Sequence, residues 1–114
     1  MEATPNIIEK AEKAVTDILL TLPETMVYHN LNHTWEVVKA ADKIGNYANL
    51  TEEEKEILML SAWFHDTGFK FNYDNHEEKS IEIAQEFLEQ NNFPAERTEK
   101  VISCIISTKI DQKP

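Results

Sequence analysis

The sequence has 114 residues, the length of one domain with a modest core. Apolar residues make up 41% of it, which predicts a folded chain, and a formal net charge of −10 argues against long anionic partners such as DNA. Since there is no apolar run of about 20 residues, no signal peptide and only one cysteine, we expect a cytoplasmic protein with no membrane span and no internal disulfide.

The first predicted helix occupies the amino-terminal part of the chain. Thr4 is expected to be its N-cap, Pro5 its first residue and Pro23 its stop signal. Its apolar residues recur at helical spacing, which predicts one buried face. These residues are Ile7, Ile8, Ala11, Ala14, Val15, Ile18 and Leu19.

A short polar loop is expected next, over residues 24–31. The second helix should then begin near Asn30 or Asn32. We expect it to end at Gly45 or Asn46, since both residue types accept the left-handed conformation of a helix cap.

Three more helices complete a predicted all-α bundle. Thr51 and Glu54 form a capping box at the start of a helix that runs to His65. A fourth helix is expected over about residues 76–90, and Phe93-Pro94 should start a fifth. We therefore expect one domain over residues 1–114, truncated at its carboxyl end because the chain stops soon after an apolar helix. The aromatic residues expected in its core are Trp35, Trp63, Phe64 and Phe69.

The four histidines are expected at helix ends, where loops gather and sites are usually built. His29 and His33 are four residues apart, so on a helix they share one face. His65 is followed by Asp66, and His76 lies at the start of the fourth helix. Two imidazoles and one carboxylate suit zinc, iron, manganese, cobalt or nickel better than calcium, and they leave positions for water and substrate.

Three segments together resemble the HD-domain superfamily of metal-dependent phosphohydrolases. They are residues 28–34 (YHNLNHT), 62–68 (AWFHDTG) and 75–80 (NHEEKS). In that superfamily one helix begins with a histidine and the next ends in a His-Asp pair about 30 residues later; here His33 and His65 are 32 apart. The first segment is also similar to the YHNxxH motif of cyclic-nucleotide phosphodiesterases.

The resemblance implies an HD-domain bundle of about five helices with one or two divalent transition metals, magnesium also being possible. His33, His65 and Asp66 would be metal ligands, and His29 the general acid that protonates the leaving oxygen. His76 would contact a second metal or the phosphate. The implied activity is hydrolysis of a small, nucleotide-like phosphomonoester or phosphodiester by metal-activated water.

Two departures from the family pattern keep alternatives open. HD domains take a last ligand from a later aspartate, and Asp111 is the only acidic residue after Glu99. Thr67 to Phe69 stands where cyclic-nucleotide phosphodiesterases have another histidine, so their substrate is not implied. A degenerate HD domain that binds a nucleotide or a partner without catalysis is one alternative, and an acidic helical interaction domain is another. A homo-oligomer is also possible, through Val101, Ile102, Ile105 and Ile106.

Overall fold

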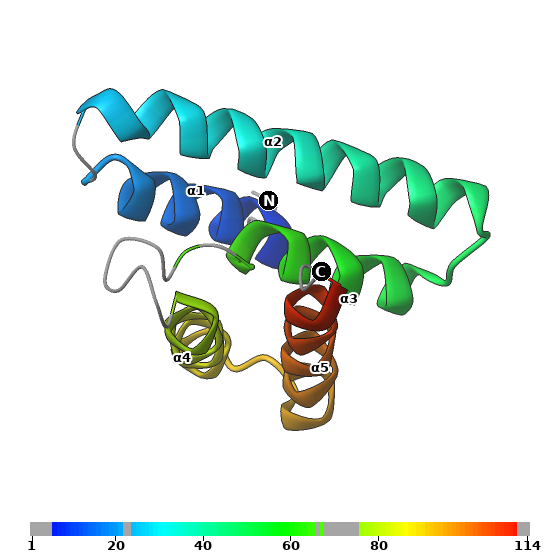
Figure 1. The fold of residues 1–114 in the computed structure, drawn as a ribbon. Coiled ribbons are helices and arrows are strands. Elements are labelled where there is room, and N and C mark those ends of the chain that lie inside the picture. The colour runs from blue at the N-terminus through cyan, green and yellow to red at the C-terminus, as the bar shows by residue number, and fades with distance from the viewer. Residues whose placement is uncertain (1–5, 22–23, 66, 68–75, 112–114) are drawn as a thin grey trace, which may run out of the picture.

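The computed structural model describes residues 6–21, 24–65, 67 and 76–111; within these ranges, side chains are described for residues 6–21, 31–65, 67 and 78–107. This part of the chain is all-α, as predicted, and none of its helices combines the length and hydropathy of a membrane span. In Figure 1, α2 extends along one side of α1 and α3, while α4 and α5 lie on the opposite side. The helices are α1 (Ile7–Leu19), α2 (Glu24–Tyr47), α3 (Glu52–Phe64), α4 (His76–Gln90) and α5 (Ala95–Asp111).

Helix α3 is the centre of the bundle, because it contacts each of the other four helices. Every residue from Leu60 to His65 is buried, so this end of α3 has no solvent-facing side. A helical segment that is buried all round carries apolar or small residues on every face, as Leu60 to Phe64 do here. By contrast, α1 buries a single stripe formed by Ala11, Val15 and Leu19, which confirms the predicted apolar face.

The N-cap of α1 differs from the prediction. Asn6 is the cap, with extended backbone angles and a side-chain oxygen that accepts a hydrogen bond from the Glu9 backbone N–H at 2.9 Å. Asparagine at this position satisfies one of the N–H groups that the first helical turn leaves unpaired. Thr4 and Pro5, the predicted start, lie outside the described residues.

Helix α2 is longer at both ends than predicted. It begins at Glu24, so residues 24–30, expected to be a loop, are helical. It continues through Gly45 and Asn46 to Tyr47. The polarity of residues 24–30 suggested a loop, but a helix at the surface of a bundle accommodates polar residues without breaking. Local propensity is a weak guide where tertiary packing extends a helix.

The residue that ends α2 is Asn49, which adopts the left-handed conformation with a φ of 58°. Its backbone N–H donates to the Asn46 carbonyl at 3.3 Å, and the Leu50 N–H donates to the Gly45 carbonyl at 3.1 Å. These two bonds form a Schellman motif. Asn92 ends α4 in the same way, also with a φ of 58°. The predicted left-handed cap therefore exists, but three to four residues later than expected.

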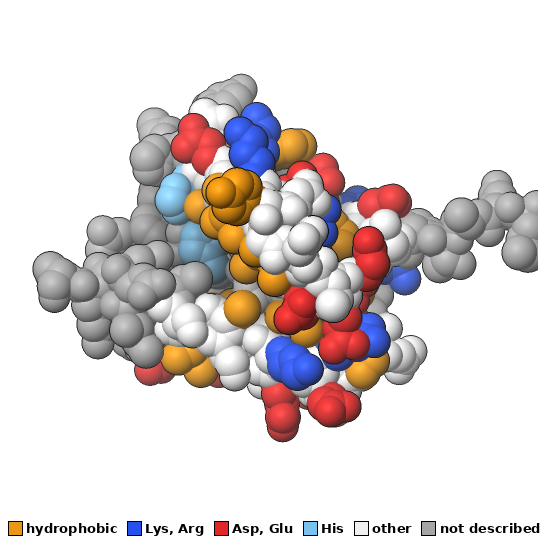
Figure 2. Space-filling model, turned by 90° about the vertical axis from the view of Figure 1, so that its right-hand side faces the viewer, with side chains coloured by type: hydrophobic (Ala, Val, Ile, Leu, Met, Phe, Trp, Pro, Cys, Tyr) orange, Lys and Arg blue, Asp and Glu red, His pale blue; other side chains and the backbone are white. Residues whose placement is uncertain are grey.

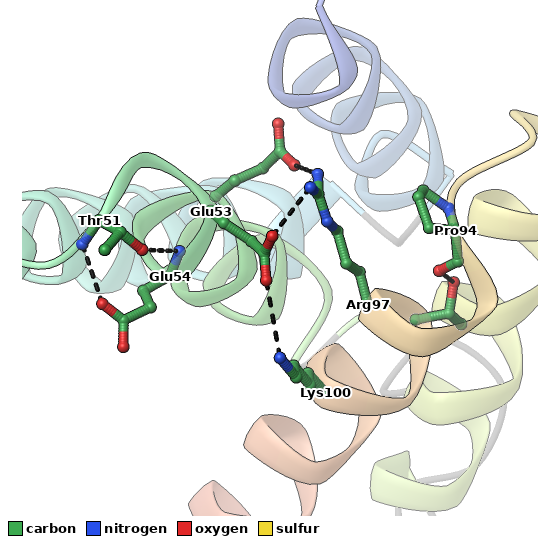
Figure 3. A network of polar contacts seen from close by, with 8 residues as sticks. Thr51, Glu53, Glu54, Pro94, Arg97 and Lys100 are labelled. Atoms are coloured by element: carbon green, nitrogen blue, oxygen red, sulfur yellow. Dashed lines mark hydrogen bonds and ion pairs between the residues drawn. The ribbon is translucent and has the colours of Figure 1, made fainter.

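Helix α3 begins with the predicted capping box. The Glu54 N–H donates to the Thr51 hydroxyl at 3.1 Å, and the Thr51 N–H donates to the Glu54 carboxylate at 2.9 Å. The same first turn joins α3 to α5 through ion pairs, shown in Figure 3. Arg97 lies 2.8 Å from one oxygen of Glu53, and Lys100 lies 3.6 Å from the other.

Of the four predicted core aromatics, two are buried and one is not, while Phe69 lies outside the described residues. Trp63 and Phe64 are 3% and 0% exposed, but Trp35 is 45% exposed and packs against Trp63 with its ring nearly perpendicular. Trp35 therefore covers the core instead of entering it, because an indole can bury one edge at a surface. On α5, Val101 and Ile105 are buried in the core, so they form no free dimer surface, whereas Ile106 is exposed.

Candidate metal centre

Two of the four histidines come together between α2 and α3. The rings of His33 and His65 have centroids 5.6 Å apart and an interplanar angle of 52°. His33 is exposed on α2, while His65 is the C-cap of α3 and only 4% exposed. The two helices are antiparallel and joined by a short connection, so residues 32 apart in the sequence meet at one end of the pair. His33 is thus accessible to solvent, and His65 is held in a fixed position by its burial.

The hydrogen bond of His65 defines the chemistry of its ring. Its Nδ1 lies 2.7 Å from the Ala62 carbonyl oxygen. Since a carbonyl only accepts, Nδ1 must carry the proton, and the neutral ring then has its lone pair on Nε2. A backbone carbonyl that holds Nδ1–H in this way is the usual outer partner of a metal-binding histidine. The bond therefore presets His65 as an Nε2 ligand.

The turn after α3 is held against the last turn of that helix. The hydroxyl of Thr67 donates to the Phe64 carbonyl at 2.9 Å, and Thr67 is 1% exposed. Both described neighbours of position 66, His65 and Thr67, are thus buried and bonded back to α3. The role of Thr67 was not predicted, although a threonine two residues after a helix-terminal histidine is a detectable signal for such a cap.

The geometry of the two imidazoles fits one bound transition metal. With metal–nitrogen distances of about 2.1 Å, two rings on one tetrahedral ion have centroids about 5 to 5.5 Å apart. The observed separation is 5.6 Å. Among the side chains that the structure describes, no third histidine, cysteine or carboxylate joins this pair. Any further ligand must therefore come from residues whose side chains are not described, or from water and substrate.

The other predicted site residues are placed only in part. Positions 29 and 33 are one turn apart within α2, so both lie in the helix interior, and the prediction that they lie at a helix boundary is wrong. The side chain of His29 is outside the described residues, as is that of His76, the first residue of α4. Asp66 is also outside them. Their roles stay predictions.

An apolar cleft of about 200 Å³ adjoins His65 between α2, α3 and α5. A larger hollow of about 540 Å³ lies elsewhere, between α1, α3 and α5, and is lined by Glu52, Glu53 and Arg97 among others. The larger hollow contains no histidine and is bordered by the α3–α5 ion pairs, so it is less suited to metal chemistry than the space at His65.

The sequence matches the model of one protein family, the HD domain, over residues 30–112 of its 114 residues. This stretch includes His33, His65, Asp66 and His76, and it begins one residue after His29. No curated protein and no solved structure matched the chain. Proteins with this domain are generally hydrolases of the metal-dependent phosphohydrolase superfamily, and they typically bind divalent metals. The match covers well over half of the chain, which therefore belongs to the HD-domain family.

Proposed function

We propose that this protein is a metal-dependent phosphohydrolase that acts on a small phosphomonoester or phosphodiester. The observation that carries the proposal is the pairing of His33 with His65, at a ring separation that suits one ion. The Ala62 carbonyl, which fixes the tautomer of the buried histidine, supports it. A formal net charge of −10 also means that a phosphate ester needs a local cation to approach this surface.

In this proposal His33, His65 and Asp66 hold the metal, and His76 holds a second metal or contacts the phosphate. A bound divalent metal would activate water and screen the charge of the phosphate. His29 lies one helical turn before His33 and donates a proton to the leaving oxygen, as an imidazolium near neutral pH can do. The assignment of His29 rests on its YHNxxH motif alone, since the family match begins at residue 30.

The first test is metal content, with transition metal measured after dialysis of the wild-type protein and of variants. His33→Ala is the cleanest variant, because His33 is exposed and its truncation leaves the core intact. We expect near-stoichiometric metal in the wild type and a large loss in His33→Ala and Asp66→Ala. Asn32→Ala, at the exposed neighbouring position, is the matched control and should retain the metal. Tight stoichiometric metal in both His33→Ala and Asp66→Ala would refute the ligand assignment.

The second test separates chemistry from metal binding. His29→Ala should retain its metal but lose turnover of phosphate esters by about 10²- to 10⁴-fold, the usual contribution of a general acid. Unchanged turnover would remove His29 from the mechanism and leave the metal site standing.

A non-catalytic HD domain is the second candidate, and one observation favours it. Among the described side chains no carboxylate joins the histidine pair. Such a domain would bind a nucleotide without hydrolysing it. Nucleotide binding by the metal-loaded protein, with no phosphate released over long incubation, would favour this reading.

A further inference from the structure

The apolar cleft next to His65 has a distinct composition. It has a volume of about 200 Å³ and is lined by residues of three helices. Apart from His65 and Ser61, its lining residues are apolar or, at position 104, a thiol, and no charged side chain is among them. Its walls include Val37, Ala40 and Ile44 of α2, Leu58 and Ala62 of α3, and Cys104 of α5.

This cleft reaches the histidine pair at His65, which lines it and whose ring neighbours that of His33. His33, Val37, Ala40 and Ile44 are spaced by four, three and four residues, so they lie along one face of α2. On the antiparallel α3, the opposite wall runs back from His65 through Ala62 to Leu58. Figure 2 shows hydrophobic side chains gathered directly beside the histidines. A ligand held at the two imidazoles would therefore have its next atoms in the cleft.

The polar atoms of the cleft are already engaged with the backbone. The Ser61 hydroxyl lies 2.8 Å from the Ile57 carbonyl and 3.2 Å from the Val101 carbonyl, to which it can donate. Nδ1 of His65 donates to the Ala62 carbonyl. A ligand group with hydrogen-bonding edges would lose its water here without finding new partners, and this costs free energy. A hydrocarbon group has no hydrogen bonds to water to lose, and it would cover apolar surface such as Ile44, which is 58% exposed.

We propose that this cleft binds the apolar part of the substrate, an aliphatic or aromatic group of about six carbons esterified to the phosphate. The inference rests on the proposed function, since it places the phosphate at His33 and His65. The size follows from comparison, because a cavity of about 150 Å³ in another protein holds benzene. The proposal narrows the substrate class from nucleotide-like esters, whose bases are polar, to esters of apolar alcohols.

The test is a series of n-alkyl phosphates, from methyl to octyl, whose affinities for the metal-loaded protein are measured by calorimetry. Each methylene that enters the cleft should raise affinity about fourfold, and the gain should level off near six carbons. Equal affinities for methyl and hexyl phosphate would overturn the proposal.

A filled cleft provides the matched pair of variants. Ala40 lines the cleft and is exposed, so Ala40→Phe places a ring in the cleft without disturbing the core. This variant should lower the affinity for hexyl phosphate by at least tenfold and leave the affinity for methyl phosphate unchanged. Ala48→Phe adds the same ring at an exposed position that does not line the cleft, and should change neither affinity. Equal effects of the two variants would count against the proposal.

Cys104 supplies a readout that is independent of turnover. It is the only cysteine, it is half-buried and it lines the cleft. Hexyl phosphate should slow its reaction with a thiol reagent, whereas methyl phosphate at equal saturation should not. Equal protection by both esters would overturn the placement of the hydrocarbon.

The outcomes for the cleft and for catalysis can be told apart. Turnover of phosphate esters with no dependence of affinity on chain length would overturn the cleft assignment and leave the proposed function standing. Binding that depends on chain length, with Cys104 protected and no turnover, would support the cleft and refute catalysis. If Ala40→Phe instead changes the sedimentation coefficient and chain length has no effect, the cleft is an interface between two copies and the proposal fails.

Discussion

The antiparallel pairing of α2 and α3 depends on a close crossing between Gly45 and Lys55. A Cβ atom added at Gly45 would lie 3.2 Å from Cγ and 3.6 Å from Cδ of Lys55. The Lys55 ammonium reaches 2.8 Å from the Asn46 amide oxygen and 3.1 Å from an Asp42 carboxylate oxygen. The lysine stem therefore passes over the glycine to fasten the start of α3 to the end of α2. We predict that Gly45→Ala is nearly neutral in the wild type but stabilising once Lys55 is shortened.

The magnitude follows from two opposing effects. Gly45 is helical, so an alanine there should stabilise the helix by about 1 kcal/mol. A contact of 3.2 Å requires the lysine stem to shift, and an off-rotamer side chain costs about 0.5–1.5 kcal/mol. The two effects nearly cancel when Lys55 is present. In a Lys55→Ala background the cost disappears, so Gly45→Ala should raise the free energy of unfolding by about 1 kcal/mol.

Urea unfolding of the wild type, the two single variants and the double variant measures this coupling as a double-mutant cycle. We expect a coupling free energy of about 0.5–1.5 kcal/mol, the cost of shifting the lysine stem. If Gly45→Ala destabilises the protein by the same amount in both backgrounds, the lysine stem is not the constraint and the reasoning is wrong.

Three further predictions concern helix ends and the α3–α5 contact. Hydrogen bonds from the Thr51 backbone N–H, and then from the Thr51 hydroxyl, hold the pKa of the Glu54 carboxyl below its usual value of 4.5. The stability that the ionised carboxylate adds is therefore complete above pH 4.5 and is lost as pH falls through the lowered pKa. Glu54→Gln, which keeps the cap without a charge, should therefore flatten the acid limb of Tm measured between about pH 6 and 3, and an unchanged limb would contradict this. Asn49→Gly and Asn92→Gly should each raise the free energy of urea unfolding, by up to about 1 kcal/mol, because both asparagines have positive φ; a loss would refute the cap assignment. Arg97→Met should cost at most about 1 kcal/mol at low salt and less at high salt, and a salt-independent loss would mean that packing, not charge, is responsible.

The features that the sequence predicted well are those determined by residues close together in the chain. The capping box at Thr51 and the bounds of α4 were predicted because a few neighbouring residues determine them. The start of α2 was missed, since the polarity of residues 24–30 is compatible with both a loop and a surface helix. The end of α2 was placed too early because glycine was favoured as the left-handed residue, whereas Asn49 has that role and Gly45 serves the crossing with Lys55.

The pairing of His33 with His65 was predictable from the sequence, but its geometry was not. The motifs predicted that His33 and His65 act together, and their rings are neighbours. Which nitrogen of His65 carries the lone pair depends on the Ala62 carbonyl three residues earlier, in a turn whose shape only the folded chain defines. The cleft was likewise missed, because its walls come from three helices and its lining residues look individually like ordinary core.

The same helix pairing that stabilises the bundle also sets the geometry of the histidine pair proposed as a metal site. Helix α3 contacts all four other helices, so the position of His65 at its end is fixed by the whole core. His33 is exposed on α2, and the distance between its ring and that of His65 depends on how α2 is registered against α3. A slip of one turn, about 5.4 Å, would carry the two rings too far apart for shared ligation. Lys55 opposes that slip at the far end of the helix pair, where it holds Asp42 and Asn46. The geometry of the histidine pair is therefore a property of the α2–α3 register, and the metal, by bridging the two histidines, would in turn stabilise that register.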